Sequence, residues 1–141
     1  MRPEPASNGA TRDAPGQGRP APLIRIEDVD VVFSKTPKPA LDLLDQGLSR
    51  DAIFKQTGLI VGVEKANLEV QRGEICVLMG LSGSGKSSLL RCINGLNTVS
   101  RGRLLIEHEG AEVDIANCSA AALKAMRTKR IAMVFQRFAL M

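Results

Sequence analysis

One eight-residue stretch constrains the fold of this chain more than any other. Residues 80–87 read GLSGSGKS, which fits the pattern of glycine, four free positions, glycine, lysine, and serine or threonine without a substitution. The apolar run at residues 75–79 precedes it and predicts a strand covered on both faces. Residues 87–94 follow with apolar side chains at helical spacing and stop at Gly95, a typical C-terminal cap. The order of strand, loop and helix predicts a phosphate-binding loop.

The chemistry of a triphosphate explains the residues of this loop. Its negative charges need backbone N–H donors turned inward, and glycines allow the backbone to approach closely. The helix that follows adds unpaired N–H groups and a positive dipole end. We expect Lys86 to reach the β- and γ-phosphates, Ser87 to coordinate Mg²⁺, and Ser88 to assist a phosphate oxygen. The alternative is an ordinary turn with a solvated Lys86, and the complete pattern favours nucleotide binding. The predicted binding residues are Gly80, Leu81, Ser82, Gly83, Ser84, Gly85, Lys86, Ser87 and Ser88.

Length, charge and cysteine content exclude several other classes. The chain has 141 residues, enough for one domain with a core. No apolar run approaches the roughly 20 residues that cross a bilayer, and the N-terminus lacks a signal-peptide segment, so we expect a cytoplasmic protein. The net charge of +4 could suit a nucleic acid, but modules that bind nucleic acids usually combine basic charge with aromatic rings that stack on bases. The chain has no tyrosine or tryptophan, so we expect no nucleic-acid partner. Cys76, Cys92 and Cys118 are odd in number and far apart, which predicts reduced, buried thiols.

The region before the loop predicts a tail, a strand and a helical insert. Residues 1–22 contain five prolines and no Val, Ile, Leu or Phe, which predicts a disordered tail. Residues 23–33 alternate like a strand, with a break at Glu27-Asp28. Phe33 ends this strand, where its ring either stacks on a base or belongs to the core. Residues 40–58 predict two short helices, with Ser49 as the N-cap of the second.

Further strands and one helix are predicted on both sides of the loop. Arg101-Gly102 predicts a turn before a strand at residues 103–107, and Gly110 a second turn. Ser119 predicts the N-cap of a helix at residues 120–127. The remaining expected strands cover residues 61–63, 66–70, 113–115 and 131–135.

Taken in this order, the chain resembles the N-terminal half of the ATP-binding subunit of an ABC transporter. The helical insert and residues 132–141 (AMVFQRFALM) are most similar to importers of quaternary amines such as choline, glycine betaine and proline betaine. The likeness runs from about Ile24 to the last residue. It implies an α/β fold of the P-loop NTPase class and the ABC type, in which an antiparallel β subdomain joins part of a parallel core sheet.

The resemblance also implies roles for residues beyond the loop. Gln136 corresponds to the Q-loop glutamine, which contacts Mg²⁺ or the attacking water and acts with Lys86 in catalysis. The alternative for Gln136 is a polar residue that ends a buried strand. Ser87 and Gln136 would share the Mg²⁺, and Phe33 would stack on adenine. The implied cofactors are ATP and Mg²⁺.

The family implies partners, and it also implies motifs that these 141 residues lack. The partners are a second ATP-binding subunit, as in a homodimer, transmembrane permease subunits, and indirectly an extracytoplasmic solute-binding protein. The implied location is peripheral, on the cytoplasmic face of the inner membrane. A Leu-Ser-Gly-Gly-type signature, a strand ending in Asp-Glu and a switch histidine are missing, so we expect residues 23–141 to be a truncated ATPase domain that is inactive alone. The alternatives are a small P-loop kinase and a non-hydrolysing regulatory module.

Overall fold

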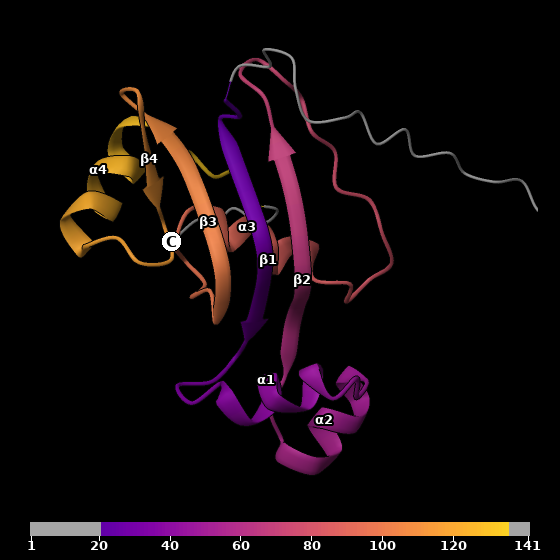
Figure 1. Cartoon of the computed structure of the whole chain (residues 1–141). Coiled ribbons are helices and arrows are strands. Elements are labelled where there is room, and N and C mark those ends of the chain that lie inside the picture. Colours follow the sequence, from indigo (N-terminus) through magenta and orange to yellow (C-terminus); the bar gives the residue numbers. More distant parts are fainter. Residues whose placement is uncertain (1–20, 136–141) are drawn as a thin grey trace, which may run out of the picture.

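The computed structural model describes residues 21–135. Its centre is a four-stranded antiparallel sheet in the order β2-β1-β3-β4 (Figure 1). Most of the tail predicted for residues 1–22, and Gln136, lie outside the described residues. Among the described residues, no helix has the length and apolar content that crossing a membrane requires. The elements are β1 (Ile24–Val32), α1 (Lys38–Asp45), α2 (Arg50–Thr57), β2 (Val61–Val70), α3 (Lys86–Ile93), β3 (Arg101–His108), β4 (Ala111–Asp114) and α4 (Ala120–Lys129).

Strand β1 is the centre of the sheet because it pairs with both β2 and β3. The break predicted at Glu27-Asp28 is confirmed: the register of β1 shifts there, and Asp28 has a φ of 45°. Opposite the break, a Cβ on Gly102 would lie 2.4 Å from the Asp28 carbonyl oxygen. The turn predicted at Arg101-Gly102 is therefore wrong. Gly102 instead lies within β3, where the absent side chain lets the two backbones approach.

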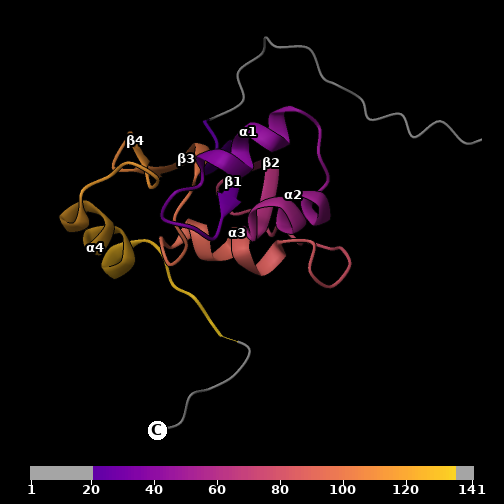
Figure 2. The same cartoon turned by 90° about the horizontal axis from the view of Figure 1, so that it is seen from below.

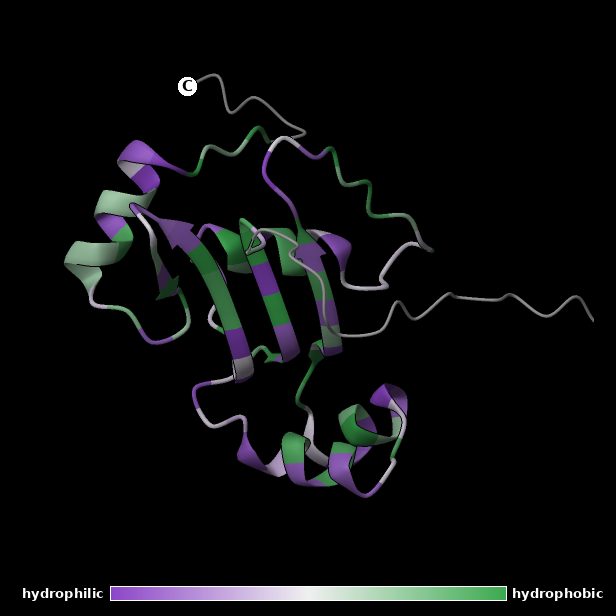
Figure 3. Ribbon diagram, turned by 45° about the horizontal axis from the view of Figure 1, so that its top comes forward, coloured by the Kyte–Doolittle hydropathy of each residue, from purple (hydrophilic) through white to green (hydrophobic). Residues whose placement is uncertain are grey.

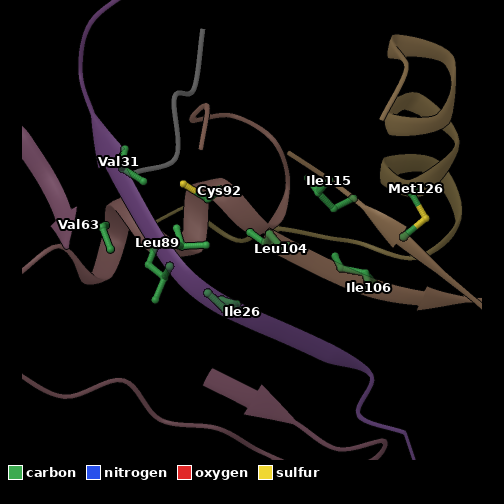
Figure 4. Close-up of a cluster of buried hydrophobic side chains, with 10 residues drawn as sticks. Ile26, Val31, Val63, Leu89, Cys92, Leu104, Ile106, Ile115 and Met126 are labelled. Atoms are coloured by element: carbon green, nitrogen blue, oxygen red, sulfur yellow. The ribbon is translucent and has the colours of Figure 1, made fainter. Parts of the chain in front are cut away.

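Helix α3 lies against one face of the sheet and α4 lies beside β3 and β4, and both contribute side chains to one apolar core (Figure 4). Figure 2, seen from below, shows both helices beside the sheet. The buried members of this core are Ile26, Val29, Val31, Val63, Leu89, Cys92, Leu104, Ile106, Ile115 and Met126. Each fully buried side chain of this size contributes about 1.5–3 kcal/mol by leaving water. This core fixes where α3, and hence the end of the phosphate loop, lies on the sheet.

The helical insert forms a second, smaller core at one end of β1 and β2. Both helices predicted there are present, and Ser49 accepts a hydrogen bond from the Ala52 amide at 3.3 Å, as an N-cap does. The buried side chains of this core are Val32, Ala40, Leu44, Ile53 and Val61. The insert therefore packs directly on the last residue of β1 and the first of β2.

Two of the predicted strands are not formed. Residues 75–79 and 131–135 have no strand pairing, so the described sheet is antiparallel throughout and the predicted parallel strands are absent from it. Most of their side chains are exposed: Ile75 at 90%, Val77 at 70% and Val134 at 86%. Both runs are apolar coil (Figure 3), and of their side chains Leu78 and Ile131 are partly buried against the main core. A strand needs a neighbour to complete its backbone hydrogen bonds, and no strand among residues 21–135 pairs with either run.

The three cysteines differ in burial. Cys92 is fully buried, Cys118 is half-buried, and Cys76, within residues 75–79, is exposed. The expectation of a buried thiol is therefore wrong for Cys76. All three are free, as predicted, and burial raises the pKa of the Cys92 thiol to about 11, so this thiol stays neutral.

Candidate nucleotide-binding site

The phosphate loop closes around the ammonium group of its own lysine. Lys86 opens α3, and its Nζ donates hydrogen bonds to the Gly80 oxygen at 2.8 Å, the Leu81 oxygen at 2.7 Å and the Ser84 hydroxyl at 3.2 Å. Gly85 is the N-cap of α3 and has a φ of 100°, a conformation that favours glycine. The cation therefore lies within the curl of the loop, beside the free N–H groups of the helix N-terminus.

The end of the loop is docked on β2 by a contact between two glycines. A Cβ on Gly85 would lie 2.3 Å from the Gly62 carbonyl oxygen, and a Cβ on Gly62 would lie 2.6 Å from the Phe33 ring. Gly62 thus separates the aromatic ring from the phosphate loop by the thickness of one backbone. The sequence interpretation missed Gly62. The available signal was a glycine inside a predicted strand, which often marks a close backbone approach.

A cavity of about 270 Å³ joins the phosphate loop to Phe33. One wall is apolar, and the other comes from the loop and the first turn of α3, which carries Lys86. The Phe33 side chain is 49% exposed, so part of its ring is free to contact a ligand. The lining residues are Phe33, Ile60, Val61, Gly62, Gly83, Gly85, Lys86, Ser87 and Ser88. An aromatic wall facing a cationic helix N-terminus suits a ligand with a flat base and a phosphate tail.

A second cavity, of about 310 Å³, lies against the other part of the loop. It has no aromatic wall, and Arg50 and Glu64 within it pair with each other at 3.4 Å. The remaining lining residues are Val63, Ala66, Leu78, Met79, Gly80, Ser84, Gly85, Lys86 and Leu89. Since Ser87, Ser88 and Phe33 all line the first cavity, the first cavity is the candidate nucleotide site.

The structure therefore brings most of the predicted residues together. Six of them line the first cavity: Phe33, Gly83, Gly85, Lys86, Ser87 and Ser88. Gly80 and Ser84 contact Lys86 from the other side of the loop, whereas Leu81 and Ser82 have exposed side chains. Gln136 lies outside the described residues.

The donor set beside the loop fits a magnesium ion that is held mainly by phosphate. Within residues 21–135, no group of three or more His, Cys, Asp or Glu side chains is arranged to hold a metal. Mg²⁺ keeps several waters and usually takes only one or two protein ligands in addition to substrate phosphates. Ser87 lines the cavity, and its hydroxyl is an oxygen donor of the kind that Mg²⁺ accepts.

Comparison with known proteins identifies the family. The family model described as ABC transporter matches residues 63–141. The chain belongs to the ABC transporter family. Proteins of this family bind ATP, typically with Mg²⁺, and couple its hydrolysis to transport.

Two curated relatives share nearly half of their aligned residues with the chain. The glycine betaine/proline betaine transport system ATP-binding protein ProV of Escherichia coli (strain K12) is 47% identical over 118 residues, which are 84% of this chain and 28% of ProV. The glycine betaine transport ATP-binding protein OpuAA of Bacillus subtilis (strain 168) is 44% identical over 117 residues, 83% of this chain and 27% of OpuAA. The chain thus spans little more than a quarter of the length of these relatives.

Solved structures confirm the fold. The dimeric structure of MJ0796, a bacterial ABC transporter cassette, superposes with a TM-score of 0.61 at 24% identity, covering 84% of this chain and 41% of that one. A post-hydrolysis dimer of the same cassette bound to ADP and phosphate gives a TM-score of 0.60 at 23% identity, with the same coverage. The described sheet and helices therefore belong to the ABC ATPase cassette fold, as predicted.

Proposed function

We propose that this chain binds Mg²⁺ and ATP as part of the ATP-binding subunit of an ABC importer for a quaternary amine such as glycine betaine. The observation that carries the nucleotide assignment is the cavity lined by both Phe33 and the phosphate loop. The choice of a quaternary amine is supported by the relatives ProV and OpuAA, which are named for glycine betaine transport.

Each residue of the cavity has a role in this proposal. Phe33 stacks on adenine, and the N-terminus of α3 with the loop amides receives the phosphates. Lys86 exchanges its hydrogen bonds to the neutral carbonyls of Gly80 and Leu81 for charge-assisted bonds to the β- and γ-phosphates, which are roughly twice as strong. The Ser87 hydroxyl joins the coordination shell of Mg²⁺. Ser88 supports a phosphate oxygen.

The remaining assignments extend the proposal beyond the cavity. Gln136 contacts Mg²⁺ or the attacking water, because a neutral amide orients water without competing for the charge of the metal. We assign residues 23–141 to one ATPase domain, in which residues 40–58 are the helical insert. The proposed partners are a second ATP-binding subunit and the transmembrane permease subunits, with a solute-binding protein acting indirectly, and the proposed location is the cytoplasmic face of the membrane.

Calorimetric titration with ATP tests the nucleotide assignment. Lys86→Ala should lower ATP affinity by about 10–100-fold, since it removes a charged hydrogen-bond donor worth about 1.5–3 kcal/mol. Lys55→Ala, which removes an exposed cation from α2, is the matched control and should bind like the wild type. Circular dichroism would check that both variants keep the wild-type fold. Equal ATP affinity of the wild type and Lys86→Ala would contradict the assignment.

A second titration separates the metal from the phosphates. Removing Mg²⁺ with a chelator should weaken ATP binding to the wild type, and Ser87→Ala should respond less to the chelator because its metal ligand is already missing. If the chelator weakens ATP binding equally in Ser87→Ala and in the wild type, Ser87 is not a ligand of the metal. That outcome would not affect the conclusion about Lys86.

A further inference from the structure

The guanidinium group of Arg101 joins the first helix of the insert to two strands of the sheet. Arg101 is the first residue of β3, and its Nε donates to Asp30 on β1 at 2.7 Å. Its Nη1 donates to both carboxylate oxygens of Asp45, at 2.9 and 2.7 Å. Asp45 is the last residue of α1. The two hydrogen-bonded carboxylates raise the pKa of Arg101, Asp45 first and Asp30 second, so the cation is permanent.

The first arm of this link fixes β1, the strand that ends immediately before Phe33. Asp30 is fully buried, and it also accepts a hydrogen bond from the Lys65 amide of β2 at 2.7 Å. A buried carboxylate is tolerated only with such partners. Two residues further on, the Val32 amide donates to the hydroxyl of Ser100, the residue before Arg101, at 2.9 Å. The end of β1 is therefore held from both sides immediately before Phe33.

The second arm supports the apolar wall of the cavity from behind. Asp45 anchors the end of α1, whose Ala40 and Leu44 pack against Val32 and Val61. Val61 itself lines the cavity. The next residue of the wall, Ile60, accepts a hydrogen bond from the Phe33 amide at 2.9 Å. The base-side wall is thus the outer surface of the small core that Arg101 ties to the sheet.

We propose that Arg101 is a positioning residue for the base side of the cavity. Through Asp30 and Asp45 it holds the wall formed by Phe33, Ile60 and Val61, and so tunes affinity for the base of the nucleotide but not for its phosphates. The phosphate half has hydrogen bonds of its own that involve neither Arg101 nor the insert, because Lys86 is held by the carbonyls of its own loop and by Ser84. This inference rests on the proposed function, since it assumes that a nucleotide occupies the cavity.

Titration with two ligands tests the inference: ATP, and inorganic tripolyphosphate, which has the phosphates without the base. Asp45→Asn is the preferred variant, because it cuts the link to the insert and leaves the buried Asp30–Arg101 pair intact. It should lower ATP affinity about threefold to tenfold, the range of a weakened polar contact, and leave tripolyphosphate affinity unchanged. Arg103→Met is the matched control. Its side chain is 60% exposed and its ion pair with Glu27 is long, at 3.8 Å, so both affinities should stay at the wild-type values.

A double variant shows whether the effect passes through the aromatic ring. In Phe33→Ala, which already lacks the stacking surface, adding Asp45→Asn should cause no further loss of ATP affinity. A merely structural role of the link would lower the affinity for both ligands together, and that result would overturn the proposal. It would also be overturned by an unchanged ATP affinity in Asp45→Asn, or by a loss that persists in the Phe33→Ala background.

The same titrations separate this inference from the proposed function. A wild type that binds neither ATP nor tripolyphosphate would overturn both. The other outcome is that the wild type binds both ligands and that Asp45→Asn has the same ratio of ATP affinity to tripolyphosphate affinity as the wild type. That result would overturn only the role of Arg101.

Discussion

Strand β1 and residues 75–79 both have the apolar composition of a strand, but β1 is a buried strand and residues 75–79 are mostly exposed coil. Ile26 in β1 is 2% exposed, whereas Ile75 is 90% exposed. The difference lies in their neighbours: β1 pairs with β2 on one side and β3 on the other, and no described strand pairs with residues 75–79. Apolar composition therefore marks a segment that can become a buried strand, and only pairing and covering layers make it one.

This contrast determines how the candidate site is held. The base-side wall belongs to the antiparallel sheet and the insert. The phosphate loop is continuous with exposed residues 75–79 on its N-terminal side, and is anchored on its C-terminal side by α3 and by the contact of Gly85 with Gly62. One half of the cavity is built on packed elements. The other half is anchored mainly at its C-terminal end, since Leu78 is the member of residues 75–79 that packs against the main core.

The largest expected effect comes from truncating the same side chain in both segments. Ile26→Ala should lower the free energy of unfolding by about 2–5 kcal/mol, since it leaves a cavity in the main core. Ile75→Ala should change it by less than about 0.5 kcal/mol, as for an ordinary surface substitution. Urea denaturation followed by circular dichroism measures both. Similar losses for the two variants would show that residues 75–79 are buried in solution and would break the comparison.

The next effect probes the contact that holds the phosphate loop against β2. Gly85→Ala places a methyl group against the Gly62 carbonyl in a left-handed conformation, so we expect ATP affinity to fall about 10–100-fold. Gly73→Ala is the control: it has a similar φ of 77°, no atom within 4 Å of the added Cβ, and a position outside the cavity. It should retain wild-type affinity in the same titration. Wild-type affinity in Gly85→Ala would mean that the loop does not need its contact with β2.

Local signals predicted most of the elements. Ser49 and Ser119 each accept the amide hydrogen bond expected of an N-cap, and the break at Glu27-Asp28 is visible in the polarity of β1. These features depend on residues within a few positions of one another. The strand predicted at residues 75–79 failed because periodicity reports only the capacity to be buried.

The sequence predicted which segments form the candidate site, and it did not predict how these segments contact one another. The phosphate loop follows from a motif of eight consecutive residues. The approach of Phe33 to that loop across Gly62, and the link from Arg101 to Asp30 and Asp45, join segments far apart in the chain. No local pattern encodes such contacts, because they depend on how β1, β2 and β3 align.

A smaller effect is expected from making the exposed apolar runs polar. The exposed side chains of residues 75–79 and 131–135 form the kind of surface that drives association, so the wild type should self-associate at high concentration. Val77→Lys and Val134→Lys together should raise the fraction of monomer in sedimentation velocity and change the free energy of unfolding by less than about 0.5 kcal/mol. Gln56→Lys, which adds a charge to an exposed position of α2, is the control and should leave association unchanged. Equal association of the wild type, the double variant and Gln56→Lys would show that these two apolar runs do not drive self-association.

The smallest effect concerns how stability falls at acidic pH, to which the ion pair between the insert and the sheet should contribute. The hydrogen bond from Arg101 lowers the pKa of Asp45 below its ordinary value of 3.8, so near that pH the folded state binds fewer protons at Asp45 than the unfolded state does. This contribution to stability is complete above pH 3.8 and disappears as the pH falls through the lower, folded value. The urea midpoint of the wild type should therefore fall more between about pH 5 and pH 3 than that of Asp45→Asn. Asp42→Asn, on the same helix, keeps the Asp45–Arg101 pair and should follow the wild type. If the urea midpoints of the wild type and Asp45→Asn fall equally with pH, this ion pair does not stabilise the attachment of the insert to the sheet.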